Sequence, residues 1–494
     1  MSLIQILILS ILSFSISDDK LVFLMTHFRH GARAPQRYKN QSAHLDYILE
    51  HWNNPGELTG MGQRMHYALG LRNRKRYIEE LKFLSKNFNP HEILIYSSQI
   101  NRTLLSAASQ LQGWYPFGTG EILKNEQIEG ALPQVDIPDD IKKKLNNLSN
   151  SALPGQMSLA PIRMINNNER KIIIYDIEQC KFRRTEMREE NYKNVPTLKK
   201  FVEDFKNKYS TILNEMYQDN NTVYDIDFVD NFCDAFIAAF TEKKEMEKLN
   251  KTGIDQDILI QECFEFSGLN FRDWISGDKD RTLATLETSK LMREFIYYMK
   301  RRIDTDINKE NIEEKLEDYS KPKMLMISGH DTTISALEMF FVKVFFNNNE
   351  SYYIHPKFAS QVAFEITTFD GDKKDENGTV IIKTYEDYYI NYYFNDKLIF
   401  NYTVEEFIKK VEPALWSDSK IDTYCKFDQK EGGSDSTNDN KDDDDKNLYH
   451  SLTIAFSIIS AVFLLIIIFL IVKANRSKTS QAIDKAGLLF KNYE

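Results

Sequence analysis

Three short apolar runs stand out from the mixed pattern of hydrophobic and polar positions along the chain. They are residues 21–25 (LVFLM), 93–96 (ILIY) and 324–327 (MLMI). Each run is brief and free of charged residues, which is typical of a strand buried on both faces of a parallel sheet. Helical patterns resume soon after two of them, at residues 103–111 and 333–341. This succession predicts a sheet domain of the α/β class.

The middle of the chain, about residues 180–305, has a helical rather than a strand-like pattern. Apolar residues there recur at the spacing of one helix face, at positions i, i+3, i+4, i+7 and i+11: Met292, Phe295, Ile296, Met299 and Ile303. Such a stripe indicates core packing and requires no catalytic role. We expect residues 180–305 to form a mainly helical cap inserted beside the sheet domain.

The two ends of the chain have patterns of their own. An apolar run too short to span a bilayer, followed by small residues, predicts a removable signal peptide over residues 1–17. Residues 428–447 contain almost no apolar side chains and are expected to form an acidic stalk. The folded domain is therefore expected over residues 18–427.

An uncharged run at residues 452–472 predicts a transmembrane helix, since as a helix it would reach about 30 Å. Basic residues follow this run and acidic residues precede it. The positive-inside rule then makes residues 473–494 a cytoplasmic tail and places the folded domain in the lumen or outside the cell. The chain is thus expected to be a single-pass type I membrane protein.

The tail contains a short pattern typical of proteins that bind sorting adaptors. Asp484 precedes the pair Leu488 and Leu489 by four residues, as in acidic dileucine signals. Together with the type I anchor, this pattern favours an endosome or lysosome over the cell surface.

Composition and charge narrow the range of functions. Hydrophobic residues make up 42% of the chain, enough for a large core, and the formal net charge is −10. Nucleic-acid binding is not expected, because no cluster of positive charge is visible. An oxidising lumen favours two disulfides among the four cysteines, but the residues alone leave three pairings open. Acceptor patterns for N-linked glycans occur at Asn40, Asn147, Asn220, Asn250, Asn349, Asn377 and Asn401.

Charged and polar clusters follow the three apolar runs. They are residues 27–33 (HFRHGAR), 101–103 (NRT) and 328–333 (SGHDTT). In open α/β sheets, ligands bind beyond the carboxyl ends of the strands. We therefore expect the three clusters to converge on one site.

The clusters hold the residue types that phosphate-ester hydrolysis requires. Forked donors that stay charged are supplied by Arg29, Arg33 and Arg102. His30 is the candidate nucleophile, because a neutral imidazole nitrogen attacks phosphorus without first losing a proton. Asp331 is the candidate proton donor to the leaving group, and His330 can hold a phosphoryl oxygen. Neither a metal nor another cofactor is needed, since the arginines already supply the positive charge.

Each cluster taken alone has a simpler interpretation. Arginines and a histidine near a turn are commonly a solvated loop, and Arg102 would serve as a surface charge at a helix start. Asp331 would make an ordinary helix N-cap. The catalytic interpretation is favoured because all three strand ends carry suitable residue types in one chain.

Residues 29–35 (RHGARAP) resemble the RHGxRxP motif of the acid phosphatase branch of the histidine phosphatase superfamily. The resemblance continues, in the expected order, in residues 56–62 (GELTGMG), Ser97-Ser98, residues 101–103 and residues 328–333. It implies a phosphohistidine intermediate on His30. It also implies that the phosphate is bound by Arg29, Arg33, Arg102 and His330, with Asp331 as proton donor.

The same resemblance implies the fold and the disulfides. The fold is a mixed, largely parallel α/β sheet flanked by helices, similar to phosphoglycerate mutase, with a helical cap. Cys180 and Cys425 resemble one disulfide of the family, and the resemblance leaves Cys233 and Cys263 as the second pair.

We expect an acid phosphatase that acts on small phosphate monoesters. One alternative is a phytase or inositol-polyphosphate phosphatase of the same fold, which comparing rates on phytate and on an aryl phosphate would separate. Another is a catalytically silent, membrane-tethered receptor for phosphoryl ligands. The presence of both a nucleophile and an acid argues against such a receptor. A homodimer is compatible with the sequence, which does not decide the oligomeric state.

Overall fold

The computed structural model describes residues 19–36, 54–165, 195–218, 220–244, 251–274, 280–309 and 322–426, with a few single residues between these ranges. The expected signal peptide, stalk, transmembrane helix and tail lie outside the described residues, and so does Cys180. Within the described ranges, no helix is both long enough and apolar enough to cross a membrane.

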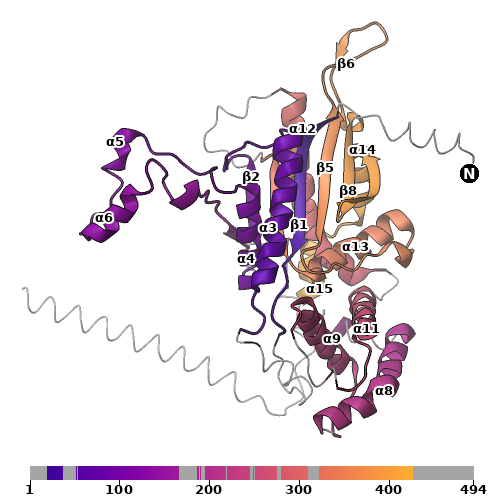
Figure 1. The fold of residues 1–494 in the computed structure, drawn as a ribbon. Coiled ribbons are helices and arrows are strands. Elements are labelled where there is room, and N and C mark those ends of the chain that lie inside the picture. Colours follow the sequence, from indigo (N-terminus) through magenta and orange to yellow (C-terminus); the bar gives the residue numbers. More distant parts are fainter. Residues whose placement is uncertain are drawn as a thin grey trace, which may run out of the picture. The chain divides into compact units, whose positions relative to one another are not determined.

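A seven-stranded mixed sheet forms the centre of the fold, with the strand order β3-β2-β4-β1-β5-β8-β9 (Figure 1). Its parallel part consists of β1 (Asp19–Arg29), β2 (Ile93–Ser97), β4 (Met324–Gly329) and the short β3 (Arg163–Met164). The three strands expected from the apolar runs are therefore confirmed, and β1 is longer than its run.

The other half of the sheet is antiparallel. It consists of β5 (Gln361–Phe369), β8 (Tyr388–Phe394) and β9 (Lys397–Thr403). A separate small hairpin pairs β6 (Lys373–Lys374) with β7 (Val380–Ile381). The expected class, an α/β fold with a mixed sheet that is parallel at its centre, is confirmed.

Helices cover both faces of the sheet, and the buried side chains of β1 point alternately to the two faces. Leu24 and Phe28 pack with α3 (Gly60–Arg74) and α4 (Asn101–Trp114) on one face. Phe23 and Met25 belong to a second apolar cluster on the other face, which contains side chains of α12 (Thr282–Ile307), α13 (Asp331–Phe346) and α14 (Val404–Val411). With both faces covered, the parallel strands are buried throughout.

The packing of α12 differs from the expectation that the cap extends to residue 305. The predicted stripe does lie on one helix face, and its five residues are all at most 4% exposed. That face packs on the sheet, however, with the ring of Phe295 at 6.0 Å from Phe23 and 4.7 Å from Phe364. The spacing of the apolar residues predicted that this helix face is buried. It could not predict whether the face packs against the cap or against the sheet.

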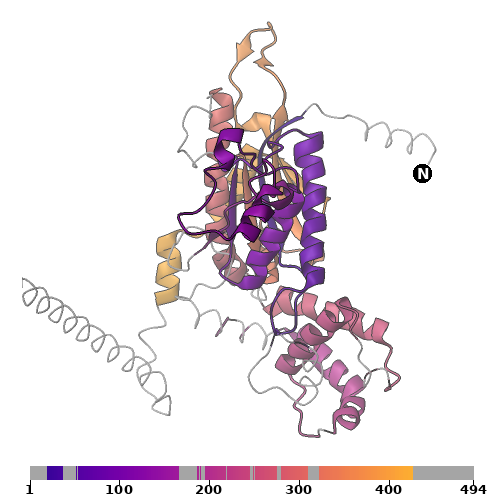
Figure 2. The ribbon, with the colours of Figure 1, turned by 60° about the vertical axis from the view of Figure 1, so that its left-hand side comes forward.

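The described cap helices are α8 (Pro196–Tyr217), α9 (Ile226–Thr241) and α11 (Gln256–Leu269), drawn in magenta and pink tones in Figure 2. They share an apolar core of their own, which includes Phe205, Phe232 and Phe266. A disulfide between Cys233 and Cys263 joins α9 to α11, with the Cα atoms 4.9 Å apart. Cys425 is also disulfide-bonded, and its pairing with Cys180 stays a prediction.

The remaining elements are short. They are α5 (Asn125–Ile128), α6 (Asp139–Asn146), α15 (Asp418–Lys426) and the helical turns η1 (Lys75–Glu80), η2 (Pro154–Gln156), η4 (Asn270–Trp274), η6 (Glu350–Tyr352), η7 (Tyr385–Asp387) and η8 (Glu412–Ala414).

A buried carboxyl lies in the core between α13 and the sheet. Glu338 of α13 is 3% exposed and accepts a hydrogen bond from the hydroxyl of Tyr392. Burial raises the pKa of Glu338 to about 8, against an ordinary value of 4.5, and the hydrogen bond from Tyr392 offsets only part of that effect. The folded protein therefore keeps this carboxyl neutral at a pH where the unfolded chain ionises it.

We predict that Glu338 lowers the stability of the protein increasingly as the pH rises from 5 to 8, so that the stability of Glu338→Gln relative to the unmodified protein increases over this interval. Because the folded pKa is raised, the stabilising contribution is complete below about pH 4.5 and is lost as the pH rises through about 8. The Glu338 contribution should be on the order of 3 kcal/mol over this interval. Denaturant unfolding of both proteins at pH 5 and pH 8 measures it. Glu376→Gln, on an exposed turn, is the control, and an equal pH dependence in all three proteins would contradict the prediction.

Candidate active site

The parallel register of the sheet brings two of the charged clusters side by side. Arg29, the last residue of β1, pairs with Gly329, the last residue of β4. His30 then donates its backbone N–H to the carbonyl of Gly329 at 3.0 Å. On its other side, the carbonyl of His30 accepts from the backbone N–H of Ala359 at 3.1 Å. The backbone of His30 is thus held from both flanks, and the residue is 2% exposed.

The loop after His30 packs directly on the start of α3, and the contact requires two glycines. A Cβ atom on Gly31 would lie 2.4 Å from the carbonyl oxygen of Gly62, and one on Gly62 would lie 2.1 Å from that of Ala32. Backbone hydrogen bonds from Ala34 to Glu57 and from Thr59 to Ala32 fasten the same two segments together. This contact explains why the GELTGMG segment accompanies RHGARAP in the sequence.

The imidazole of His30 is held in one orientation and kept neutral. Its Nδ1 lies 2.9 Å from the carbonyl oxygen of Gly31. A carbonyl only accepts, so the proton is on Nδ1 and the lone pair is on Nε2. The pKa of His30 is held well below its ordinary value of 6.5, first by burial and then by the charges of Arg29, Arg33 and Arg102. His30 therefore has the protonation state and the tautomer of a nucleophile.

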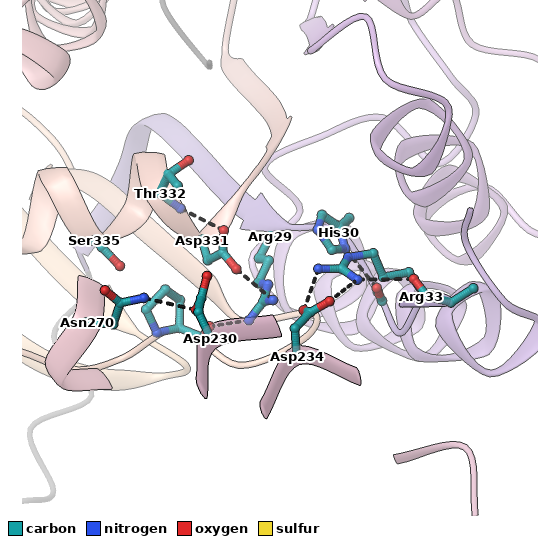
Figure 3. A network of polar contacts seen from close by, with 12 residues as sticks. Arg29, His30, Arg33, Asp230, Asp234, Asn270, Asp331, Thr332 and Ser335 are labelled. Atoms are coloured by element: carbon teal, nitrogen blue, oxygen red, sulfur yellow. Dashed lines mark hydrogen bonds and ion pairs between the residues drawn. The ribbon is translucent and has the colours of Figure 1, made fainter. Parts of the chain in front are cut away.

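Two of the arginines are paired with carboxylates. Arg29 lies 2.6 Å from Asp331 (Nη2 to Oδ2) and donates through Nη1 to the carbonyl of Pro356 at 2.8 Å. Its guanidinium also stacks over the ring of Phe358, 4.5 Å from the centroid. Arg33 donates through Nη2 and Nη1 to the two oxygens of Asp234, at 2.7 and 3.1 Å (Figure 3).

Arg102 and His330 complete the ring of charged and polar groups around His30. Arg102 is the second residue of α4, and its charge lowers the pKa values of both histidines. His330 follows β4; its Nε2 lies 2.9 Å from the hydroxyl of Ser98, and its ring centroid is 5.6 Å from that of His30. Burial, and then Arg102, lowers the pKa of His330 to about 3. His330 is therefore neutral.

Asp331 is the first residue of α13, and the N-cap position belongs to His330. Its Oδ1 accepts the backbone N–H of Thr332 at 2.9 Å, and its Oδ2 contacts Arg29. Burial acts to raise the pKa of Asp331, but Arg29 above all outweighs this, so that the pKa lies below its ordinary value. This carboxyl is therefore ionised and paired with Arg29.

All six candidate residues from the sequence thus lie together at the carboxyl edge of the sheet, with Arg29 paired to Asp331 and the charge of Arg102 close enough to lower the pKa values of both histidines. Within the described residues, no group of three or more histidine, cysteine, aspartate or glutamate side chains is arranged to hold a metal.

Two further acidic residues at the site, Asp230 and Asp234, come from the cap helix α9 and were not among the candidates (Figure 3). Asp230 accepts a hydrogen bond from Asn270 at 2.9 Å. Burial, and then Asp234, raises the pKa of Asp230 to about 7. Their signal in the sequence is the spacing of Asp227, Asp230 and Asp234 at i, i+3 and i+7, which places carboxylates on one face of a phenylalanine-rich helix.

Comparison with known proteins shows which family the chain resembles. The family model described as histidine phosphatase superfamily (branch 2) matches residues 20–395. Prostatic acid phosphatase from Bos taurus is 24% identical over 328 residues, which cover 65% of this chain and 68% of that protein. Lysosomal acid phosphatase from Xenopus laevis is 32% identical over 120 residues, 24% of this chain and 27% of that protein. Several such matches, including this one, span only about a quarter of the relatives' lengths (24%, 27% and 26%).

Among solved structures, the apo form of Hafnia alvei phytase aligns with a TM-score of 0.50 and 12% identity, covering 83% of this chain and 98% of that one. At this identity the likeness supports the fold alone.

We predict that Gly62→Ala destabilises the protein by about 2 kcal/mol, because the added Cβ forces the loop after His30 away from α3. The matched control is Gly60→Ala at the first position of the same helix, where nothing lies within 4 Å of an added Cβ. This control should change the stability by no more than about 0.5 kcal/mol. Denaturant unfolding of the three proteins measures both values, and equal stability of the two variants would show that the close contact is unimportant.

Proposed function

The chain belongs to branch 2 of the histidine phosphatase superfamily, and on this premise we propose that it is an acid phosphatase that hydrolyses phosphate monoesters through a phosphohistidine on His30. The observation that carries the proposal is the state of His30. It is a neutral imidazole with its proton on Nδ1, surrounded by the charges of Arg29, Arg33 and Arg102. Such a ring is a nucleophile placed where a phosphoryl group would be bound.

In the proposed reaction, the phosphoryl oxygens are held by Arg29, Arg33, Arg102 and His330. Nε2 of His30 attacks phosphorus in line, the P–O bond to the alcohol breaks, and the leaving oxygen takes a proton from Asp331. Asp331 then accepts a proton from water as the water attacks the phosphohistidine. The P–N bond breaks, inorganic phosphate leaves, and Asp331 is protonated again.

The charges of the site favour activity in acid. Arg29 keeps the pKa of Asp331 low in the absence of a competing anion. A bound phosphoryl dianion compensates the charge of Arg29, which raises the pKa of Asp331 and lets it carry the proton that the leaving group needs. Activity should fall as the pH rises through the pKa that Asp331 has when the phosphoryl group is bound. On the acid side His30 stays neutral, whereas with its ordinary pKa of 6.5 only about 3% of it would be neutral at pH 5.

The alternatives have less support. A polyanionic inositol phosphate would meet the carboxylate of Asp234 on the cap side of the site, which disfavours a phytase activity. A silent receptor has no use for a nucleophile and a proton donor together.

The location is part of the same proposal. Relatives named lysosomal and prostatic acid phosphatase support an enzyme of the lysosome or one that is secreted. The anchor at residues 452–472, the adaptor contacts of the tail and a homodimer stay predictions.

We predict that His30→Ala abolishes hydrolysis of an aryl phosphate and the formation of a phosphoenzyme, because the imidazole that would form the P–N bond is then missing. Labelled phosphoenzyme should be trapped in denaturant at alkaline pH, where the P–N bond survives, and mapped to His30 by peptide analysis. His91→Ala, at a partly exposed turn before β2, is the control. His66 is unsuitable, since it is fully buried against Phe28. A label on another residue would contradict the mechanism.

We predict that Asp331→Asn slows esters of poor leaving groups more than esters of good ones. An alkoxide needs a proton as the bond breaks, whereas a nitrophenolate leaves without one, so the two losses should differ on the order of 100-fold. Rates over a series of leaving groups, measured for both proteins, test this. Equal slowing across the series would remove Asp331 from the role of proton donor.

A further inference from the structure

Asp234 occupies the atoms of Arg33 that a phosphoryl group would use. Both terminal nitrogens of Arg33 donate to its carboxylate, and the side chains are only 6% and 21% exposed. Carboxylates and phosphates are bound by arginine in the same forked geometry. The two anions therefore compete for one donor pair.

Asp234 lies on α9, and contacts on two sides of this helix hold it in place. At the carboxyl end of α9, the carboxylate of Glu242 accepts a hydrogen bond from Thr59, in the segment that packs on the loop after His30. The neighbour of Asp234 in the chain, Cys233, is tied to α11 by its disulfide. These two contacts fix the part of α9 that carries Asp234 relative to the loop after His30 and to α11.

A displaced Asp234 has a partner on its own helix. Asp230 lies one turn earlier and, with its pKa raised to about 7, carries a proton in mild acid. A carboxylic acid at i and a carboxylate at i+4 can share that proton in a hydrogen bond. A rotation of the Asp234 side chain would exchange Arg33 for Asp230.

We propose that Asp234 is an internal competitor of the phosphoryl group for Arg33, and that it sets the affinity of the site for phosphate. This rests on the proposed function, since it concerns the same arginines. The carboxylate carries one charge and a phosphoryl dianion two, so a dianion near Arg29 and Arg102 gains more from the exchange than a singly charged anion does. The same competition favours the release of inorganic phosphate after each turnover.

The opposite role for Asp234 makes the opposite prediction. If Asp234 merely holds Arg33 in position for the substrate, its removal leaves the guanidinium misplaced and weakens phosphate binding. The sign of the change in affinity therefore separates competition from positioning.

We predict that Asp234→Asn in the full protein lowers the inhibition constant of inorganic phosphate on the order of tenfold and lowers KM for an aryl phosphate. Asp234→Ser, which also removes the charge, should do the same and serves if the first variant does not fold. Asp227→Asn is the matched control, because it removes one charge from an exposed position of the same helix. Its constants should stay within about twofold of the unmodified protein.

An unchanged or higher inhibition constant in the Asp234 variants would overturn the proposal while leaving the phosphatase function intact. An equal decrease in Asp227→Asn would also overturn it, since the effect would then come from the general field of the helix. An unmodified protein that neither hydrolyses an aryl phosphate nor binds inorganic phosphate would refute the proposed function and this inference together.

Discussion

The parallel pairing of β1 with β4 is the constraint on which the site depends. Its register sets Arg29 opposite Gly329, so the next residues of both strands leave the sheet at the same edge. His30 and His330 then follow on neighbouring strands, and Asp331 opens α13 beside Arg29. A one-residue slip would turn every side chain of β1 to the other face, and it would separate His30 from Asp331.

The second constraint is the balance of charge inside the site. Three arginines and two histidines gather where water is largely excluded, and such a cluster of cations is costly unless anions compensate it. The protein meets this requirement in two ways. Both histidines are kept neutral, and Asp331 and Asp234 pair with Arg29 and Arg33. Carboxylates thus already compensate the positive charge to which a phosphoryl group would bind.

Local patterns in the sequence predicted the strands that are buried along nearly their whole length. The runs in β1, β2 and β4 are apolar without interruption because helices cover both faces, and their strand ends pointed to the candidate residues. The antiparallel strands β5, β8 and β9 were not predicted: their buried positions alternate with exposed ones or are occupied by polar and tyrosine side chains, as in β8. Asp234 and Arg33 are 201 residues apart in the chain, so their contact depends on tertiary packing. Tertiary packing also decides whether the apolar face of α12 contacts the cap or the sheet. No local pattern contains that information.

β1 and β4, whose ends carry His30 and His330, lie far apart in the chain, and this affects how the protein folds. The cap helices make their core and their disulfide among residues 195–269, a local set of contacts that closes small loops. The catalytic edge instead joins β1 to β4 across about 300 residues, so its closure carries a far larger entropic cost. During synthesis, the RHGARAP segment is made long before β4 exists to hold it. The chain therefore carries His30 for most of its assembly without the rest of the site, and the proposed activity would begin only when β4 and α13 have joined the sheet.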